Sequence, residues 1–200
     1  MLSTGRVPAA VAWAKRGLGE VTVAPVEGWT IVSATGVAQA RYPYDDAVRT
    51  LAGRPVSWRM RASLGFFRVG SQAVIVLHPR GWRPVVRWLI WTPRNGRVPP
   101  DGLPEAEVAD VVIVAGLDQS LQARAATSLT ALLERGEGTA DDILREALEI
   151  LALPGAELLA GKADIRALPG ARVVPPKPRF AREFDKLIDE LERERSETEA

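Results

Sequence analysis

Alternating apolar and polar positions in the first half of the chain predict β-strands. Two β-branched runs, over residues 21–26 and 29–35, are separated by Glu27 and Gly28, a connection typical of a tight hairpin. Stricter alternation over 56–61 places Val, Trp and Met on one side and Ser and Arg on the other, as in a half-buried strand. These runs predict three strands before the middle of the chain.

A meander is predicted to follow these strands. The apolar runs at 64–69 and 72–78 flank a turn at 70–71, and the second run has the apolar density of a central strand. Alternation resumes over 82–91, but Pro84 lacks the backbone donor that a paired strand needs. We therefore expect this last segment to be an edge strand or to begin pairing late.

The second half of the chain shows helical spacing instead. After a loop predicted over 92–104, apolar residues recur at helical intervals over 117–136 and again over 139–151. Thr139 is the expected N-cap of the later helix, because a threonine hydroxyl can accept from a first-turn amide. A short helix that ends at a glycine is also predicted within the strand-rich half, over 43–53.

The end of the chain combines a stiff spacer with an amphipathic helix. Residues 173–179 contain three prolines, which favour an extended conformation, and residues 180–200 carry an apolar stripe followed by a charged tail. A helix set off in this way suits docking in a groove of a partner protein; the alternative is packing back on its own domain. The candidate partner-helix anchors are Phe180, Phe184, Leu187 and Leu191.

Together these patterns predict an α+β fold, with a mainly antiparallel sheet in the N-terminal half packed against a helical C-terminal half. We expect a single domain over 1–172, strand-rich at 20–92 and helical at 104–160. The proline-rich spacer at 173–179 and the terminal helix and tail at 180–200 would follow it. With 200 residues and 46% apolar content, the chain is long enough to bury one substantial core.

Charge is strongly segregated along the chain, although the formal net charge is only +1. Residues 47–100 contain ten arginines and no lysine, aspartate or glutamate, whereas residues 101–200 carry twelve basic and 21 acidic side chains. Such asymmetry bears on partners and solubility more than on fold. The arginine-rich segment is therefore the first candidate contact region.

This segment supports two interpretations. In the predicted strands, arginines lie opposite the most apolar faces and aromatic rings interleave with them, an arrangement that suits single-stranded nucleic acid. Alternatively, the arginines pair with the chain's own acidic helices or keep an exposed sheet face soluble. Three tryptophans, Trp58, Trp82 and Trp88, fall on apolar faces and are expected in the core. The candidate anion or nucleic-acid contacts are Arg59, Arg61, Arg68, Arg83, Arg87, Phe67 and Trp91.

Familiar enzyme chemistries find little support in the sequence. The chain has no cysteine and one histidine, His78, which ends an apolar run and is expected to be structural. The acidic pairs at 45–46 and 141–142 fall in first turns of predicted helices, where they are expected as caps instead of metal ligands. The sequence has no glycine-rich loop of the kind that binds phosphates or dinucleotides, and no Gly-x-Ser-x-Gly nucleophile elbow. We expect no cofactor and no metal, and an enzyme that uses carboxylates or His78 is the third alternative.

The chain is expected to be a non-enzymatic interaction or regulatory protein of the cytoplasm. The apolar run at 7–14 is short and contains Pro8, unlike a secretory leader, and the run at 111–117 is far below the roughly 20 residues that span a bilayer. We expect a protein partner, contacted through the arginine-rich sheet region, the C-terminal helix or both. Nucleic-acid binding through the arginine and aromatic face is the alternative, and membrane association is not expected.

Overall fold

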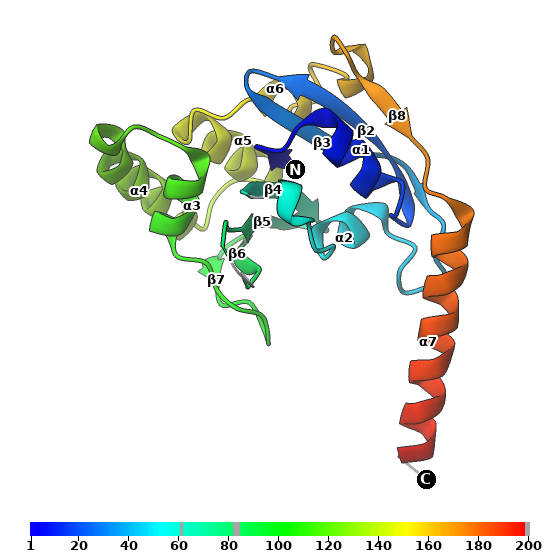
Figure 1. Cartoon of the computed structure of the whole chain (residues 1–200). Helices are drawn as coiled ribbons and strands as arrows, with labels where there is room; N and C mark the ends of the chain where they lie inside the picture. The colour runs from blue at the N-terminus through cyan, green and yellow to red at the C-terminus, as the bar shows by residue number, and fades with distance from the viewer. Residues whose placement is uncertain (61, 82–84, 199–200) are drawn as a thin grey trace.

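A large antiparallel sheet forms the centre of the molecule, and helices follow mainly in the second half of the chain (Figure 1). The computed structural model describes residues 1–60, 62–81 and 85–198. The predicted α+β class, with a mainly antiparallel N-terminal sheet and a helical C-terminal half, is confirmed. The strands are β1 (Leu2–Ser3), β2 (Gly19–Val26), β3 (Trp29–Ala38), β4 (Ser63–Val69), β5 (Gln72–His78), β6 (Arg87–Thr92), β7 (Gly96–Val98) and β8 (Arg172–Val174).

The sheet consists of the meander β4-β5-β6-β7 and of the β2–β3 hairpin extended by β8, and the two-residue strand β1 joins these two parts at the centre. Among the described residues the strand order is β7-β6-β5-β4-β1-β3-β2-β8. β1 pairs with β3 on one side and with β4 on the other, antiparallel to both. Since β3 and β4 both run opposite to β1, they are parallel to each other, and only β1 separates them.

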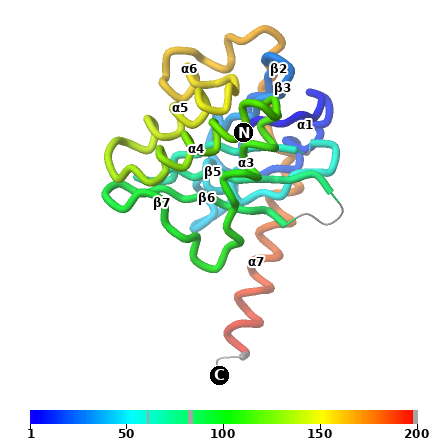
Figure 2. The backbone as a smooth tube through the Cα atoms, turned by 90° about the vertical axis from the view of Figure 1, so that its left-hand side faces the viewer, coloured from blue at the N-terminus to red at the C-terminus, as the bar shows by residue number. Residues whose placement is uncertain are grey.

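Helices cover both faces of the sheet and bury two cores (Figures 1 and 2). The first core lies under α3, α4, α5 and α6, and the second lies under α1 and α2. Neighbouring residues of β5 point to opposite cores, Ile75 to the first and Val76 to the second, which explains the continuous apolar run of this strand. The helices are α1 (Val7–Ala14), α2 (Ala47–Ala52), the 3₁₀ helix η1 (Trp58–Met60), α3 (Val108–Ala115), α4 (Gln119–Glu134), α5 (Ala140–Ile150), α6 (Ala156–Leu159), the 3₁₀ helix η2 (Ile165–Ala167) and α7 (Pro178–Thr198).

The predicted hairpins form where the turn residues permit them. Glu27 and Gly28 have φ angles of 47° and 82°, so both central residues of the β2–β3 turn take the left-handed conformation that matches strand twist. The β4–β5 pair is also present as predicted. β6 begins only at Arg87, which confirms the late start expected after Pro84; residues 82–84 themselves lie outside the described residues.

One acid of each predicted pair caps a helix. Asp46 caps α2 and accepts from the amides of Val48 and Arg49. Thr139 and Asp142 form a capping box at the start of α5, in which each side chain accepts from the other residue's backbone amide. The helices predicted over 43–53, 117–136 and 139–151 correspond to α2, α4 and α5.

The strand predicted over 56–61 is wrong. This segment contains the short helix η1, and Trp58 is 73% exposed instead of filling the core. Val56 and Met60 are both buried, and their separation of four residues suits a helical turn as well as it suits alternation. Arg61 lies outside the described residues.

Short elements without a clear period were not predicted: α1, β1, α3, α6, η2, β7 and β8. Pro8 lies in the first turn of α1, where its missing amide is harmless, so it helps to begin a helix. β7 turns part of the loop predicted over 92–104 into a hairpin with β6. β8 pairs with β2 and buries Val174, so the predicted spacer over 173–179 begins inside the sheet.

The last helix, α7, leaves the body of the molecule and projects well beyond it (Figures 1 and 2). Neither core contains a side chain from α7. In the part of the chain that the structure describes, no helix, α7 included, is both long and apolar enough to cross a membrane.

Candidate functional site

Three arginines of the acid-free segment pair with carboxylates from the second half of the chain. They come from β4, β6 and β7, and their partners lie at the start of α5, on α3 and in the loop before α3. These three arginines therefore meet the chain's own acidic half, as the second interpretation of the segment expects. The pairs are Arg68–Asp141, Arg87–Asp110 and Arg97–Glu105.

The two aromatic rings considered for base stacking lie inside the protein. Trp91 is fully buried and its Nε1 donates to the carbonyl of Arg135 (2.6 Å), while Phe67 is 6% exposed in the second core. Neither ring presents a face to solvent. Trp88 packs half-buried against the second core, as expected. The candidates Arg61 and Arg83, and with them Trp82, lie outside the described residues.

The residues considered for catalysis are not brought together. His78 is buried at the end of β5, opposite Ser63 of β4. Asp46 and Asp142 are engaged as helix caps. Over residues 1–60, 62–81 and 85–198, no group of three or more histidine or carboxylate side chains is arranged to hold a metal ion.

The helix α7 rests on the loop between β3 and α2 by one side only. The ring of Phe184 meets that of Tyr44 edge to face, with centroids 5.0 Å apart, and Ile188 is buried. Arg41 pairs with two acids of the helix, Asp189 at 2.7 Å and Glu192 at 3.2 Å. The helix therefore has a defined orientation relative to this loop.

The four candidate anchors of α7 differ in exposure. Phe180 and Phe184 are half-buried, whereas Leu187 and Leu191 are 50% and 51% exposed. The first turns of the helix thus pack on the body, and the apolar stripe continues outward without cover from the described residues.

A groove of about 690 Å³ lies between α7 and the body, and we call it the α7 groove. Phe180, Phe184 and Leu187 form the wall on the helix side. The opposite wall includes apolar contributions from Leu18, Pro43, Tyr44 and Pro55, and the charged lining residues are Arg16, Arg49, Arg54 and Glu183. An apolar groove with more basic than acidic charge around it therefore lies beside the exposed leucines.

Arg54 is held rigidly at this groove. Its guanidinium lies 3.9 Å from the centroid of the Trp13 ring, and its Nη2 donates to the Trp13 carbonyl (2.5 Å). Burial, together with the positive charge of Arg16, lowers the pKa of Arg54 to about 10. No carboxylate among the described residues forms an ion pair with Arg54 or Arg16. The groove thus presents a preorganised positive charge that lacks a counterion in the described chain.

A second groove, of about 680 Å³, lies between α1 and η1. Arg6, Arg16 and Arg59 line it together with the exposed ring of Trp58, and the Arg59 guanidinium lies 5.2 Å from the centroid of that ring. We call it the basic groove. This groove combines Arg59, an arginine predicted from the sequence, with an aromatic ring open to solvent.

Sequence reasoning did not single out Arg16, Arg54 or Tyr44, because each comes from a different segment and only the fold brings them together. One usable signal was the absence of acids from residues 1–19 as well as from 47–100. Both segments line both grooves: residues 16–18 and 49–55 line the α7 groove, and α1 and η1 line the basic groove.

Comparison with known proteins found no matching family model, no similar curated protein and no similar solved structure.

Proposed function

We propose that this protein is a non-enzymatic interaction protein whose α7 groove binds an acidic amphipathic segment of a partner protein. The observation that carries the proposal is Arg54, a half-buried guanidinium beside Arg16 that has no carboxylate partner among the described residues. An acidic side chain from a partner would supply that counterion. Charge-assisted bonds to a fixed guanidinium are among the stronger polar contacts at interfaces.

The exposed face of α7 supports the same partner chemistry. Leu187 and Leu191 lie one helical turn apart and are half-exposed, so they offer adjacent apolar contacts beside the groove. A partner helix with leucine on one face and glutamate along its edge would cover these side chains and reach Arg16 and Arg54. This is the helix-in-groove mode of recognition, in which apolar anchors give affinity and edge charges give orientation.

A defined probe tests the proposal. A fluorescent amphipathic helical peptide with leucine on one face and glutamate at its edges should bind the full chain, and a peptide with lysine in place of glutamate should bind at least roughly ten-fold more weakly. Leu187→Asp and Arg16→Glu should each weaken the glutamate peptide by a similar factor. Leu121→Asp, at a 48% exposed leucine on α4, is the matched control and should bind normally.

The outcome that contradicts the proposal is equally concrete. If Leu187→Asp binds the glutamate peptide as the wild type does, or if both peptides bind alike, the α7 groove is not an acidic-helix site. In that case, cross-linking in cell extract from position 187 should capture the same proteins as cross-linking from the control position 121.

The basic groove supports nucleic-acid binding as a second candidate function. Trp58 is 73% exposed next to Arg59, and Arg6 and Arg16 line the same groove, which combines a stacking surface with cations that can follow phosphates. Fluorescence anisotropy with single-stranded DNA and RNA should show binding at roughly 50 mM salt that falls steeply by roughly 200 mM. Trp58→Ala and Arg59→Ala should weaken it, and Arg124→Ala on α4 should not. Absent or salt-insensitive binding would exclude this function.

A further inference from the structure

The helix α7 itself has the chemistry that the α7 groove requires of a partner. Its apolar stripe includes the half-exposed leucines Leu187 and Leu191. Exposed glutamates recur along one edge of this stripe, because intervals of seven, four and three residues return to nearly the same side of a helix. They are Glu183, Glu190, Glu194 and Glu197. This chain therefore contains an acidic amphipathic helix of the kind that the proposed function calls for.

Charge is also polarised along the length of α7. Residues 178–186 carry three basic and two acidic side chains, whereas residues 187–198 carry two basic and five acidic ones. The helix meets the body near its beginning, and its second half projects outward (Figures 1 and 2). Two of the five acids, Asp189 and Glu192, pair with Arg41 of the body. The other three belong to the leucine edge, on a different side of the helix, where another molecule can reach them.

The α7 groove carries the opposite charge. Its charged lining residues are three arginines, Arg16, Arg49 and Arg54, and one glutamate, Glu183. Among the described residues, no carboxylate forms an ion pair with Arg16 or Arg54. The acidic half of α7 is complementary to this charge, but in one copy α7 lines the groove up to Leu187. The acids that follow are therefore placed to reach the groove of another copy.

We propose that the occupant of the α7 groove is the α7 helix of a second copy of this chain. The inference rests on the proposed function and names its partner. The two helices would lie antiparallel across a two-fold axis, with Leu187 and Leu191 of each copy against those of the other. Each helix would place its acidic half beside the groove and the basic first half of the other copy, an arrangement that favours association. A parallel pair would bring the two acidic halves together, which disfavours it.

The two-fold arrangement closes the assembly at two copies. The same surface serves on both molecules, so each copy gives a helix to one groove and receives a helix in its own. The exposed leucines of both copies become buried, together with the groove-lining rings of Phe180 and Phe184. The contact is confined to one helix and one groove on each copy, which is small for a permanent dimer. We therefore expect a dissociation constant in the roughly micromolar range.

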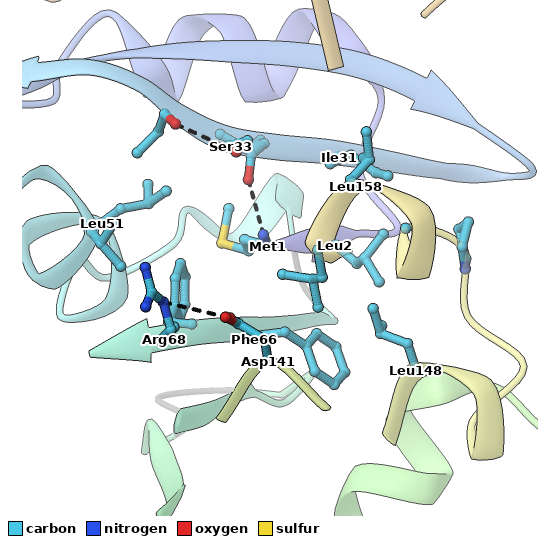
Figure 3. Close-up of a pocket in the computed structure, with 17 residues that line it drawn as sticks. Met1, Leu2, Ile31, Ser33, Leu51, Phe66, Arg68, Asp141, Leu148 and Leu158 are labelled. Carbon is cyan, nitrogen blue, oxygen red and sulfur yellow. Dashed lines mark hydrogen bonds and ion pairs between the residues drawn. The ribbon is translucent and has the colours of Figure 1, made fainter. Parts of the chain in front are cut away.

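Two other cavities do not suit this helix. The cavity shown in Figure 3 has a volume of about 280 Å³, and the arginine in its lining, Arg68, already pairs with Asp141 at 3.5 Å. The basic groove contains arginines, but none of its described lining residues belongs to α7. A helix bound in either place would leave Leu187 and Leu191 uncovered. The helix of a different protein is the remaining occupant, and sedimentation of the purified chain separates it from a second copy.

Sedimentation equilibrium of the full chain tests the proposal. Between roughly 1 and 100 µM protein, at roughly 50 mM salt, we expect the apparent mass to rise from that of a monomer toward that of a dimer. Leu187→Asp should raise the dissociation constant of the dimer at least roughly ten-fold, because the substitution is present in both copies. Leu121→Asp on α4 is the matched control and should leave that constant unchanged. Circular dichroism establishes that both variants fold.

A charge swap tests the partner and the antiparallel orientation together. One variant, Arg16→Glu with Arg49→Glu, makes the groove acidic; the other, Glu194→Arg with Glu197→Arg, makes the second half of α7 basic. Each variant alone should have a dissociation constant at least roughly ten-fold above that of the wild type, because its groove and its helix then repel each other. An equimolar mixture should recover a dimer within about three-fold of the wild-type constant, since each groove again meets a helix of opposite charge.

The outcomes separate this inference from the proposed function. If the full chain remains a monomer up to roughly 100 µM while the glutamate peptide binds, the groove takes a helix of a different protein; this inference is then wrong and the proposed function holds. If neither a second copy nor the peptide binds, both are wrong. A dimer that Leu187→Asp leaves unchanged, or a charge-swapped mixture that stays monomeric, would also overturn the inference.

Discussion

At the residue scale, Gly96 combines a left-handed backbone conformation with close backbone neighbours. It has a φ of +66°, and a Cβ there would lie 2.7 Å from the Glu134 carbonyl oxygen and 2.9 Å from that of Leu133. Gly70 has a similar φ of +61° but open space around it. We expect Gly96→Ala to lower the free energy of unfolding by roughly 2–4 kcal/mol and Gly70→Ala by about 1 kcal/mol, since only the first adds a clash to the conformational cost.

Urea unfolding of both variants measures this difference. Equal losses would mean that the β6–β7 hairpin moves away from the end of α4 at little cost, contrary to the close backbone contact seen in the structure. The sequence predicted a loop over 92–104 but gave no sign of the helix behind Gly96, because that contact joins residues far apart in the chain.

Single residues show what periodicity can and cannot establish. Alternation correctly placed Trp88 and Trp91 on opposite faces of one strand, and the two side chains do pack in different cores. It could not show that both faces are covered, so Trp91 was taken as a candidate surface residue although it is fully buried. Exposure is decided by the helices that cover each face of the sheet, and Trp91 lies in the first core, under α3, α4, α5 and α6.

At the element scale, length separates what could be predicted from what could not. Helices α4 and α5 and strands β2 to β5 are long enough to show a period, and their end signals fixed most boundaries. β1 has two residues and no possible period, yet it occupies the centre of the sheet. The way in which the two parts of the sheet join could therefore not be predicted from periodicity.

The helix α7 is expected to be dispensable for the stability of the body. Its side chains belong to neither core, and its ion pairs with Arg41 are largely exposed, which limits each to roughly 0.2–1 kcal/mol. Removing residues 178–200 should shift the Tm of the remaining chain by less than about 4 °C while abolishing binding of the glutamate peptide. Thermal melts followed by circular dichroism check the first part, and a large drop in Tm would show instead that α7 supports the fold.

At the scale of the whole molecule, the charge segregation of the sequence is partly neutralised by the fold. Three arginines of the acid-free segment form ion pairs with carboxylates of the second half: Arg68–Asp141, Arg87–Asp110 and Arg97–Glu105. Arg16 and Arg54 have no such partner among the described residues, so positive charge is concentrated on the side of the molecule formed by α1, α2 and η1. The sequence predicted an uneven charge distribution, but only the fold shows which arginines are left for a ligand.

The three pairs give a prediction that separates neutralised from free arginines. Replacing Arg68, Arg87 and Arg97 by glutamine should lower the free energy of unfolding by roughly 1–2 kcal/mol at low salt, since each pair is partly exposed and contributes below about 1 kcal/mol. Replacing Arg59, Arg94 and Arg124 by glutamine makes the same change in net charge at positions without an ion pair in the described chain, and should cost less than about 0.5 kcal/mol. Urea unfolding at roughly 50 and 500 mM NaCl measures the free energy of unfolding of both variants. The difference between them should be smaller at the higher concentration, because salt screens exposed ion pairs. If the two variants have the same free energy of unfolding at low salt, the three pairs do not hold the two halves together. Arg68, Arg87 and Arg97 would then be as available to an external anion as the unpaired arginines.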